Sequence, residues 1–293
     1  MAMEVKHMMQ AVLVAACWGG NFIAAAIVLD VFPPLWLLAV RFAIVAALLL
    51  PFFPRPVGRI KDIALLSLLL GTLHFSLMFG SIALGLDVSS AVISSQLGVP
   101  FSCLLGSIFF KDTIGRWRAG GMLISFIGVI IIAGSPAITE HYGPFMLACV
   151  GALAWAAGNI YIKKFDGANI LGVLAWLSLF AFPQLALLSL LFESGQMAML
   201  AHASLEIWAA FAYTVAISTL LAYGLWYRLM QRFPVSQVVP YSLLVPVFGL
   251  SFAQWFFAEP LTWQFLLGGA FTVTGVAVIV FRKPVHLNAG KGQ

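Results

Sequence analysis

Ten long apolar runs decide what this chain can fold into. Each is about 20 residues long or slightly longer and holds at most one charged residue; they cover 8–29, 31–54, 63–86, 88–110, 119–139, 142–162, 167–192, 207–227, 233–258 and 260–281. A bilayer core of about 30 Å is crossed by roughly 20 apolar residues in an α-helix. Because only short connections separate the runs, the sequence predicts an all-α integral membrane protein with ten transmembrane helices and no soluble domain.

The composition excludes other ways of hiding these runs. Hydrophobic residues make up 62% of the chain and charged residues 9%, which leaves more apolar surface than a water-soluble domain of ordinary composition can bury. The runs are apolar on every face, whereas the strands of a transmembrane barrel alternate apolar and polar positions. The first run is longer than a signal-peptide core and is followed by nine similar runs, so we expect it to be retained.

The basic residues are placed on one side of the predicted membrane. Lys and Arg occupy the N-terminal segment, every second connection and the tail, as Lys6, Arg55, Arg59, Lys61, Lys111, Arg116, Arg118, Lys163, Lys164, Arg228, Arg232, Arg282, Lys283 and Lys291. The opposite connections carry only acidic residues, namely Asp30, Asp87, Glu140, Glu193, Glu206 and Glu259. By the positive-inside rule, both termini are predicted to be cytoplasmic in a bacterial inner membrane. The net charge of +5 therefore does not indicate binding to nucleic acid.

Self-similar segments indicate that the chain is duplicated. FFKD and FFAE are each followed by two glycines, at 121 and 128 and at 268 and 275, with a constant offset of 147. SQLGVPF around Pro100 echoes SLLVPVF around Pro246, and WGGNF echoes WAAGNI. We expect two repeats, 1–137 and 142–282, and a cytoplasmic tail, 283–293.

The predicted repeats are inverted, because each holds five spans and the second therefore enters from the opposite side. This architecture is typical of secondary transporters, whose two halves meet at a midplane site and alternate access to it. The paired glycines of the fifth and tenth spans indicate close helix packing rather than chemistry.

These motifs resemble the EamA-type members of the drug/metabolite transporter superfamily over essentially the full length. The likeness is carried by WGGNF, the RF pair at Arg41 and Phe42, AGNIYIKK, AYGLW, PYSLLVPVFGL and FFAEPLT with its following GG. Within the family, the chain is similar to exporters of amino acids and their metabolites, including the cysteine and O-acetylserine exporters and, more distantly, aromatic amino-acid exporters. The resemblance implies a central cavity lined by spans 1 to 4 and 6 to 9, with spans 5 and 10 at the periphery.

The preferred function is export of amino acids or related small amphipathic metabolites by alternating access, with a small-molecule substrate and membrane lipid as partners. A nucleotide-sugar or drug carrier of the same superfamily stays open, as does a channel or a membrane-embedded lipid-handling enzyme. The sequence holds no GxxxxGKS, HExxH or GxSxG motif, so we predict neither an enzyme nor a cofactor or metal. It does not indicate an oligomeric state.

Polar residues inside apolar runs are costly in lipid and indicate a cavity or a helix contact. His74 lies about 17 Å from the cytoplasmic edge of its span at 1.5 Å per residue. A substrate or proton contact and a hydrogen bond to a neighbouring helix both explain it. Asn21 and Asn159 occupy matching depths in corresponding spans, and a helix–helix hydrogen bond is the favoured interpretation for them.

Aromatic and hydroxyl residues near the midplane are candidates for a semi-polar cavity wall, although packing explains each aromatic as well. Trp18, Trp155 and Trp176 lie away from the predicted interfaces. The remaining candidates are Phe75, Met78, Ser95, Gln96, Tyr223, Tyr227, Tyr241 and Ser242. Pro100, Pro240 and Pro246 interrupt the fourth and ninth spans and are candidate hinges.

Arg41 is the one Lys or Arg inside an apolar run, about 12 Å below the periplasmic end of its span at 1.5 Å per residue. No other span contains Asp or Glu in our segmentation. Its charge must therefore be met by carbonyls of a broken helix, by water or by the carboxylate of a substrate. Since the RF pair belongs to the family pattern regardless of substrate, a helix-packing role explains Arg41 equally well.

Overall fold

The structure is a computed structural model, and it describes residues 3–54, 59–110, 114–165, 167–196, 203–233 and 235–281. The described residues form helices and connections and no strand, as predicted. In chain order the helices are α1 (Val5–Leu29), α2 (Pro34–Leu49), η1 (Leu50–Phe52), α3 (Ile60–Leu66), η2 (Ser67–His74), α4 (Phe75–Ala83), α5 (Val88–Ser95), α6 (Gly98–Phe110), α7 (Arg116–Ala133), α8 (Pro136–Thr139), α9 (Tyr142–Ile162), η3 (Lys163–Phe165), α10 (Ile170–Phe192), α11 (Leu205–Ala212), η5 (Tyr213–Leu221), α12 (Ala222–Arg232), α13 (Val235–Val238), η6 (Val239–Leu243), α14 (Leu244–Phe257) and α15 (Trp263–Phe281).

Ten stretches of these helices are long and apolar enough to cross a membrane, which confirms the predicted fold class. Their helical form follows from the solvent, because a backbone in hydrocarbon must satisfy its N–H and C=O groups internally. We number them span 1 (α1), span 2 (α2 and η1), span 3 (α3, η2 and α4), span 4 (α5 and α6), span 5 (α7), span 6 (α9), span 7 (α10), span 8 (α11, η5 and α12), span 9 (η6 and α14) and span 10 (α15).

The two ends of the bundle differ in charge. We call the end that carries Lys6, Arg59 and Lys164 the basic end, and the end that carries Glu193 and Glu259 the acidic end. Large exposed indoles mark both ends, with Trp117 near the basic end and Trp208, Trp255 and Trp263 near the acidic end. Tryptophan gathers at membrane–water interfaces, so this distribution fits a bundle that spans the bilayer between the two ends.

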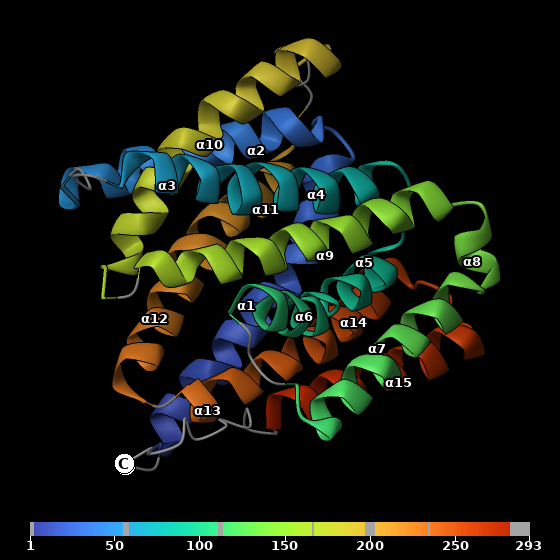
Figure 1. Ribbon diagram of the computed structural model, residues 1–293. Helices are drawn as coiled ribbons and strands as arrows, with labels where there is room; N and C mark the ends of the chain where they lie inside the picture. The colour runs from blue at the N-terminus through green and yellow to red at the C-terminus, as the bar shows by residue number, and fades with distance from the viewer. Residues whose placement is uncertain are drawn as a thin grey trace, which may run out of the picture.

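Two helix pairs form opposite margins of the bundle, α2 with α10 and α7 with α15, and the other spans lie between them (Figure 1). The α7/α15 crossing depends on glycine. A Cβ placed on Gly121 would lie 2.7 Å from the carbonyl oxygen of Gly275, and Gly128 meets the Gly268 carbonyl as closely. The predicted role of these glycines in close packing is confirmed. Between them, Ser125 Oγ donates to the Thr272 carbonyl oxygen at 3.2 Å, across 147 residues of chain.

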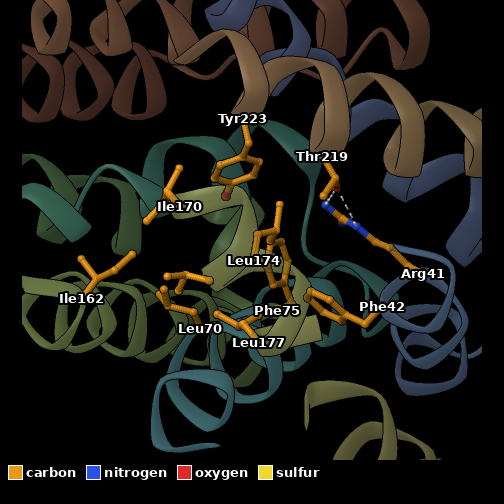
Figure 2. A pocket seen from close by; sticks show the side chains of 11 residues that line it. Arg41, Phe42, Leu70, Phe75, Ile162, Ile170, Leu174, Leu177, Thr219 and Tyr223 are labelled. Carbon is orange, nitrogen blue, oxygen red and sulfur yellow. Dashed lines mark hydrogen bonds between the residues drawn. The ribbon is translucent and has the colours of Figure 1, made fainter. Parts of the chain in front are cut away.

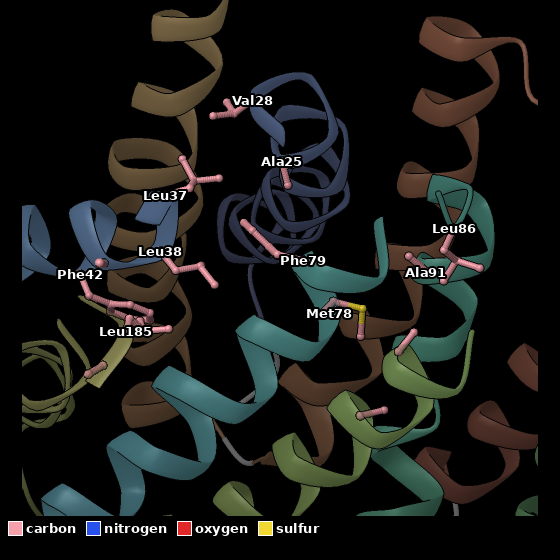
Figure 3. Close-up of a cluster of buried hydrophobic side chains, with 14 of the residues drawn as sticks. Ala25, Val28, Leu37, Leu38, Phe42, Met78, Phe79, Leu86, Ala91 and Leu185 are labelled. Carbon is pink, nitrogen blue, oxygen red and sulfur yellow. The ribbon is translucent and has the colours of Figure 1, made fainter. Parts of the chain in front are cut away.

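The apolar core lies mainly toward the acidic end. Ala25, Val28, Leu37, Leu38 and Phe79 from spans 1 to 3 pack there, together with Leu86, Ala91 and Leu185, and each of these side chains is at most 4% exposed (Figure 3). A core of this density has few voids larger than a water molecule. The acidic half of the bundle is therefore largely filled, although a cavity of about 50 Å³ lies at that end beside Asp87, Ser90 and Glu259.

Spans 3 and 8 each contain a π-helical segment, η2 and η5, at positions 146 to 147 residues apart. In a π-helix the backbone hydrogen bonds reach one residue farther than in an α-helix, and such turns are rare and frequently occur at functional sites. Spans 4 and 9 also lose regular α-helix at corresponding places, after Ser95 and over η6. Pro240 lies within η6, whereas Pro100 and Pro246 lie in the first turn of the α-helix that follows each interruption. Their role as hinges stays a prediction.

Candidate functional site

A cavity of about 50 Å³ lies between spans 2, 3, 6, 7 and 8 (Figure 2). One water needs roughly 10–15 Å³ of such space, so the cavity holds a few waters in this state and must widen to accept a solute of amino-acid size. It is lined by Arg41, Phe42, Leu70, Phe75, Ile162, Ile170, Val173, Leu174, Leu177, Thr219 and Tyr223. The resemblance also places spans 1, 4 and 9 around a central cavity, but no described residue of these spans lines this one.

Arg41 provides the charge of the cavity. Its side chain is 2% exposed, and its Nη2 and Nε both donate to Thr219 Oγ1, at 2.6 and 3.2 Å. Three phenylalanine rings surround the guanidinium, with the Phe75 centroid 4.8 Å from Cζ and those of Phe79 and Phe42 5.9 and 6.0 Å away. Cation–π contacts of this kind stabilise a charge by about 0.5–2 kcal/mol each.

One nitrogen of the Arg41 guanidinium is left without a partner in the described structure. Nη1 is buried and has no hydrogen-bond partner among the residues that the structure describes. No described carboxylate forms an ion pair with Arg41 either. The ion pairs of the described residues are formed by Glu4 and Asp62, and both lie at the basic end. A buried charge with an unused donor is costly unless something else meets it. The cavity is therefore matched to a group that accepts hydrogen bonds and carries negative charge.

Thr219 is held in place by the π-helical segment η5. Its Oγ1 donates to the carbonyl oxygen of Thr214, five residues earlier, at 2.8 Å. That bond follows the wider turn of η5 and leaves the lone pairs of Oγ1 for Arg41. Tyr223, one turn farther along on α12, extends its hydroxyl toward the space beside Ile170 and Leu174 (Figure 2). We call the contact between Arg41 and Thr219 the charged junction.

A second polar contact of the same kind joins spans 3 and 7, away from the cavity. Gln184 Oε1 accepts from Thr72 Oγ1 at 2.8 Å, and its Nε2 donates to Ser67 Oγ at 2.8 Å. Ser67 in turn donates to the Ala64 carbonyl at 2.7 Å. We call this the neutral junction. The amide oxygen and the amide nitrogen of Gln184 therefore both have a hydrogen-bond partner.

The cavity extends toward the basic end, because Ile162 ends α9 and Ile170 begins α10 there. Span 3 meets span 6 at this end. Asp62 accepts a hydrogen bond from the Tyr161 hydroxyl and lies 3.4 Å from Lys164 Nζ. Arg59 Nη1 donates to the Lys164 carbonyl at 2.6 Å. These contacts are partly or largely exposed, and hydrogen bonding to Tyr161 raises the pKa of Lys164 above its usual value.

At the acidic end, two carboxylates tie helix N-termini across the bundle. Glu193 accepts from the backbone N–H groups of Leu35 and Trp36 at 2.7 and 2.9 Å, at the start of α2. Glu259 accepts from Val88 and Ser89 at 2.7 and 2.9 Å, at the start of α5. The first N–H groups of a helix have no partner within it, and its dipole favours an anion there. With the core of Figure 3, these bonds close the cavity from the acidic side.

Of the sequence candidates, three lie together in the cavity, namely Arg41, Phe75 and Tyr223. Others contact the same helices from outside it. Trp18 packs on Tyr223 with ring centroids 5.4 Å apart. His74 Nδ1 lies 2.9 Å from the Gly151 carbonyl oxygen, which joins spans 3 and 6. Trp176 Nε1 donates to the Pro54 carbonyl at 3.1 Å, just beyond the basic-end terminus of span 2.

The remaining candidates are spread over other helix contacts. Trp155 lies against Gly98, where a Cβ would come within 2.5 Å of its ring. Asn21 Oδ1 and Asn159 Nδ2 are buried without a hydrogen-bond partner in the described part of the chain. Met78 and Gln96 are buried, Ser95 and Ser242 bond to their own helices at Val92 and Val239, and Tyr241 packs beside Val238. Tyr227 lies on α12, with its side chain outside the described residues.

Sequence reasoning missed most of the lining, because Leu70, Ile162, Ile170, Val173, Leu174 and Leu177 look like lipid-facing residues. Thr219 did carry a signal: it stands 147 residues after Thr72, the offset that relates the two motifs. Among the described residues, no cluster of three His, Cys, Asp or Glu side chains is placed to hold a metal ion. The arrangement is suited to binding and movement of a solute.

Known proteins match this chain over nearly its full length. The profile of the EamA-like transporter family matches residues 6–134 and 144–281. A Salmonella typhimurium protein named "Probable amino-acid metabolite efflux pump" is 29% identical over 287 residues, covering 95% of this chain and 96% of the relative. An Escherichia coli protein of the same name is 27% identical with the same coverage. A solved crystal structure at 17% identity has a TM-score of 0.63 over 94% of this chain and 96% of its own, and therefore shares the fold.

Proposed function

The chain belongs to the EamA-like transporter family, and from this premise we propose that it exports amino acids or related small amphipathic metabolites across the cytoplasmic membrane by alternating access. The two relatives named as probable amino-acid metabolite efflux pumps support the substrate class. The single observation that carries the proposal is the cavity beside Arg41, which combines one buried cation with apolar walls. That combination is complementary to a small solute with an acidic group and an apolar body.

We propose that residues 1–137 and 142–282 are inverted copies, and that their relative movement opens the cavity alternately to the two sides. The matching positions of η2 and η5 support this, as does the match of the family profile to two separate segments. The acidic end is closed by Glu193 and Glu259 while the cavity extends toward the basic end. In this proposal the structure is a state that receives solute from the basic side.

We propose that the basic end faces the cytoplasm, as the positive-inside rule requires. A cysteine added to the parent protein at either of two exposed positions tests this, Ser194→Cys at the acidic end and Ala168→Cys at the basic end. On intact cells, an impermeant thiol reagent should label position 194 and reach position 168 only after permeabilisation. The parent protein, with its own three cysteines, measures the background. Labelling of position 168 from outside would overturn the orientation.

Transport is tested with the purified protein in proteoliposomes, using counterflow of labelled amino acids and their N-acetyl and O-acetyl derivatives. At least one compound should accumulate faster than in protein-free liposomes. A thiol probe at Leu174→Cys, in the cavity wall, distinguishes a carrier from a channel. A carrier exposes position 174 to one side at a time and changes its labelling when substrate is added, whereas an open channel is labelled from both sides. Absence of counterflow for the whole panel would remove the proposed function.

A further inference from the structure

We infer that the cavity recognises its solute through a carboxylate alone, so that the preferred substrate is an apolar monoanion whose nitrogen is absent or acylated, rather than a zwitterionic amino acid. The inference rests on the proposed transport function and specifies the substrate class of the same cavity. It follows from two observations, what Arg41 offers and what the rest of the lining lacks.

Arg41 offers one edge of its guanidinium. Nε and Nη2 are both taken by Thr219, whereas Nη1 is buried without a partner in the described structure. Because Thr219 is neutral, it holds the Arg41 guanidinium in place without neutralising its positive charge. A carboxylate that reaches Nη1 would form a charge-assisted hydrogen bond, which is stronger than a bond between neutral groups. The guanidinium is thus oriented in advance, and the incoming carboxylate would give Nη1 the hydrogen-bond partner that it lacks in the described structure.

The lining offers an ammonium group no opposite charge, because the hydroxyl groups of Thr219 and Tyr223 are neutral. None of the described lining residues is Asp or Glu. The hydroxyl of Thr219 already accepts two bonds from Arg41 and donates to Thr214. A free α-ammonium is carried one carbon away from the carboxylate. It would therefore enter a desolvated space within a few ångströms of Arg41, with like charge and no opposing carboxylate.

Three acidic side chains at the two ends of the bundle already have hydrogen-bond partners outside the cavity. Asp62 bonds to Tyr161 and Lys164 at the basic end. Glu193 and Glu259 each bind two backbone N–H groups at the acidic end. Apart from Arg41, Thr219 and Tyr223, the described walls of the cavity are leucine, isoleucine, valine and phenylalanine side chains. A body of about the size of a leucine side chain fits their chemistry.

Four compounds with one carbon skeleton test the inference on the wild-type protein: leucine, N-acetylleucine, 4-methyl-2-oxopentanoate and leucinamide. Each competes against a labelled compound that the protein carries in counterflow, and each is also measured as a ligand-induced rise in the unfolding temperature in detergent. We expect N-acetylleucine and 4-methyl-2-oxopentanoate to compete at least about tenfold more strongly than leucine, and leucinamide not to compete, given the usual strength of a hydrogen bond to a charged group.

Arg41→Gln is the matched variant, because Gln184 already makes such contacts to the equivalent segment in the neutral junction. It should fold and should bind the two anions about 10- to 100-fold more weakly. Leucine binding as well as N-acetylleucine, or anion affinity unchanged in Arg41→Gln, would overturn the inference while transport itself persists. If wild-type protein carries none of the transport panel, the proposed function fails instead, and the shift in unfolding temperature still reports whether the anions bind.

Discussion

The charged and neutral junctions share the same backbone feature, a π-helical segment, but one binds a charged side chain and the other a neutral one. Each joins a side chain of span 2 or span 7 to a threonine in a π-helical segment of the other half, Arg41 to Thr219 and Gln184 to Thr72. The two threonines stand 147 residues apart, and each segment carries a second hydroxyl residue five positions earlier. Ser67 and Thr214 donate to carbonyls three residues back in the same way, at 2.7 and 2.8 Å.

The difference lies in what remains unsatisfied. At the neutral junction Gln184 uses its amide oxygen and nitrogen on two hydroxyls, which is what a purely structural contact requires. At the charged junction Arg41 keeps a buried Nη1 without a described partner and faces the cavity. The comparison teaches that the two π-helical segments support side-chain contacts of the same kind, and that only the contact at Arg41 leaves a buried donor atom free for the solute we propose.

The largest expected effect comes from removing the surplus charge. Arg41→Leu should lower the rate of counterflow of a carboxylate substrate by at least about 10- to 100-fold, because a hydrogen bond to a charged group is lost. Gln184→Leu, the matched change at the neutral junction, should leave the rate within about threefold. Counterflow in proteoliposomes of equal protein content measures both. Equal losses in the two variants would mean that both junctions are structural.

The next effect concerns the threonine that holds each junction. Thr219→Val removes the acceptor of two Arg41 donors, so we expect a loss of about 2–3 kcal/mol in the free energy of unfolding. Thr72→Val removes one neutral hydrogen bond, at a cost of about 1 kcal/mol. Equilibrium unfolding in mixed micelles measures the two. A cost for Thr72→Val equal to or above that for Thr219→Val would contradict the assignment of the charge to one junction.

A smaller effect is expected when the charged junction is made neutral. Arg41→Gln removes a buried, partly paired charge and keeps a donor for Thr219. Since replacing a buried charge by a neutral group is often without net cost, its free energy of unfolding should stay within about 1 kcal/mol of wild type. The same unfolding measurement applies, with Arg41→Lys as the control that keeps the charge. Severe destabilisation by Gln together with full stability of Lys would show that the charge itself holds the fold.

The smallest effect is the difference in unfolding free energy between changes at Ser67 and Thr214, the hydroxyl residues five positions before the two junction threonines. Ser67 accepts from Gln184, whereas Thr214 donates to Phe211 within its own span. Ser67→Ala should therefore cost about 1 kcal/mol and Thr214→Val about 0.5 kcal/mol, toward the lower end of the range for a neutral hydrogen bond. Unfolding curves collected side by side resolve the order of the two values. A larger cost for Thr214→Val than for Ser67→Ala would mean that Thr214 supports the charged junction more than Ser67 supports the neutral junction.

The sequence predicts the spans because length and charge spacing act locally, so ten helices and their two ends follow from reading the chain. It does not predict the π-helical segments, since a change of helical period leaves no trace where nearly every side chain is apolar. The cavity walls are missed for the same reason. Arg41 was found as a buried charge, but its partner Thr219 lies 178 residues away, and such a contact depends on tertiary packing.

Trp176 illustrates the remaining limit of sequence reasoning. Its position in the seventh run places it well inside the span, yet its indole reaches the Pro54 carbonyl just past the basic-end terminus of span 2. Side chains in a helix lean toward its N-terminus, and α10 begins at the basic end with Ile170. The depth of a Cα atom therefore does not give the depth of a long side chain.

The glycine crossing of α7 and α15 also bears on how the chain is made. The two helices meet backbone to backbone at Gly121 and Gly275, but α7 ends at Ala133 and α15 begins at Trp263. At about 5–20 residues per second of synthesis, the ribosome needs roughly 7 to 26 s to travel between those points. During that time α15 is not yet available to the glycines of α7, and a chain cut short before Gly268 never makes this crossing. Formation of this margin therefore has to wait until α15 has been synthesised and inserted.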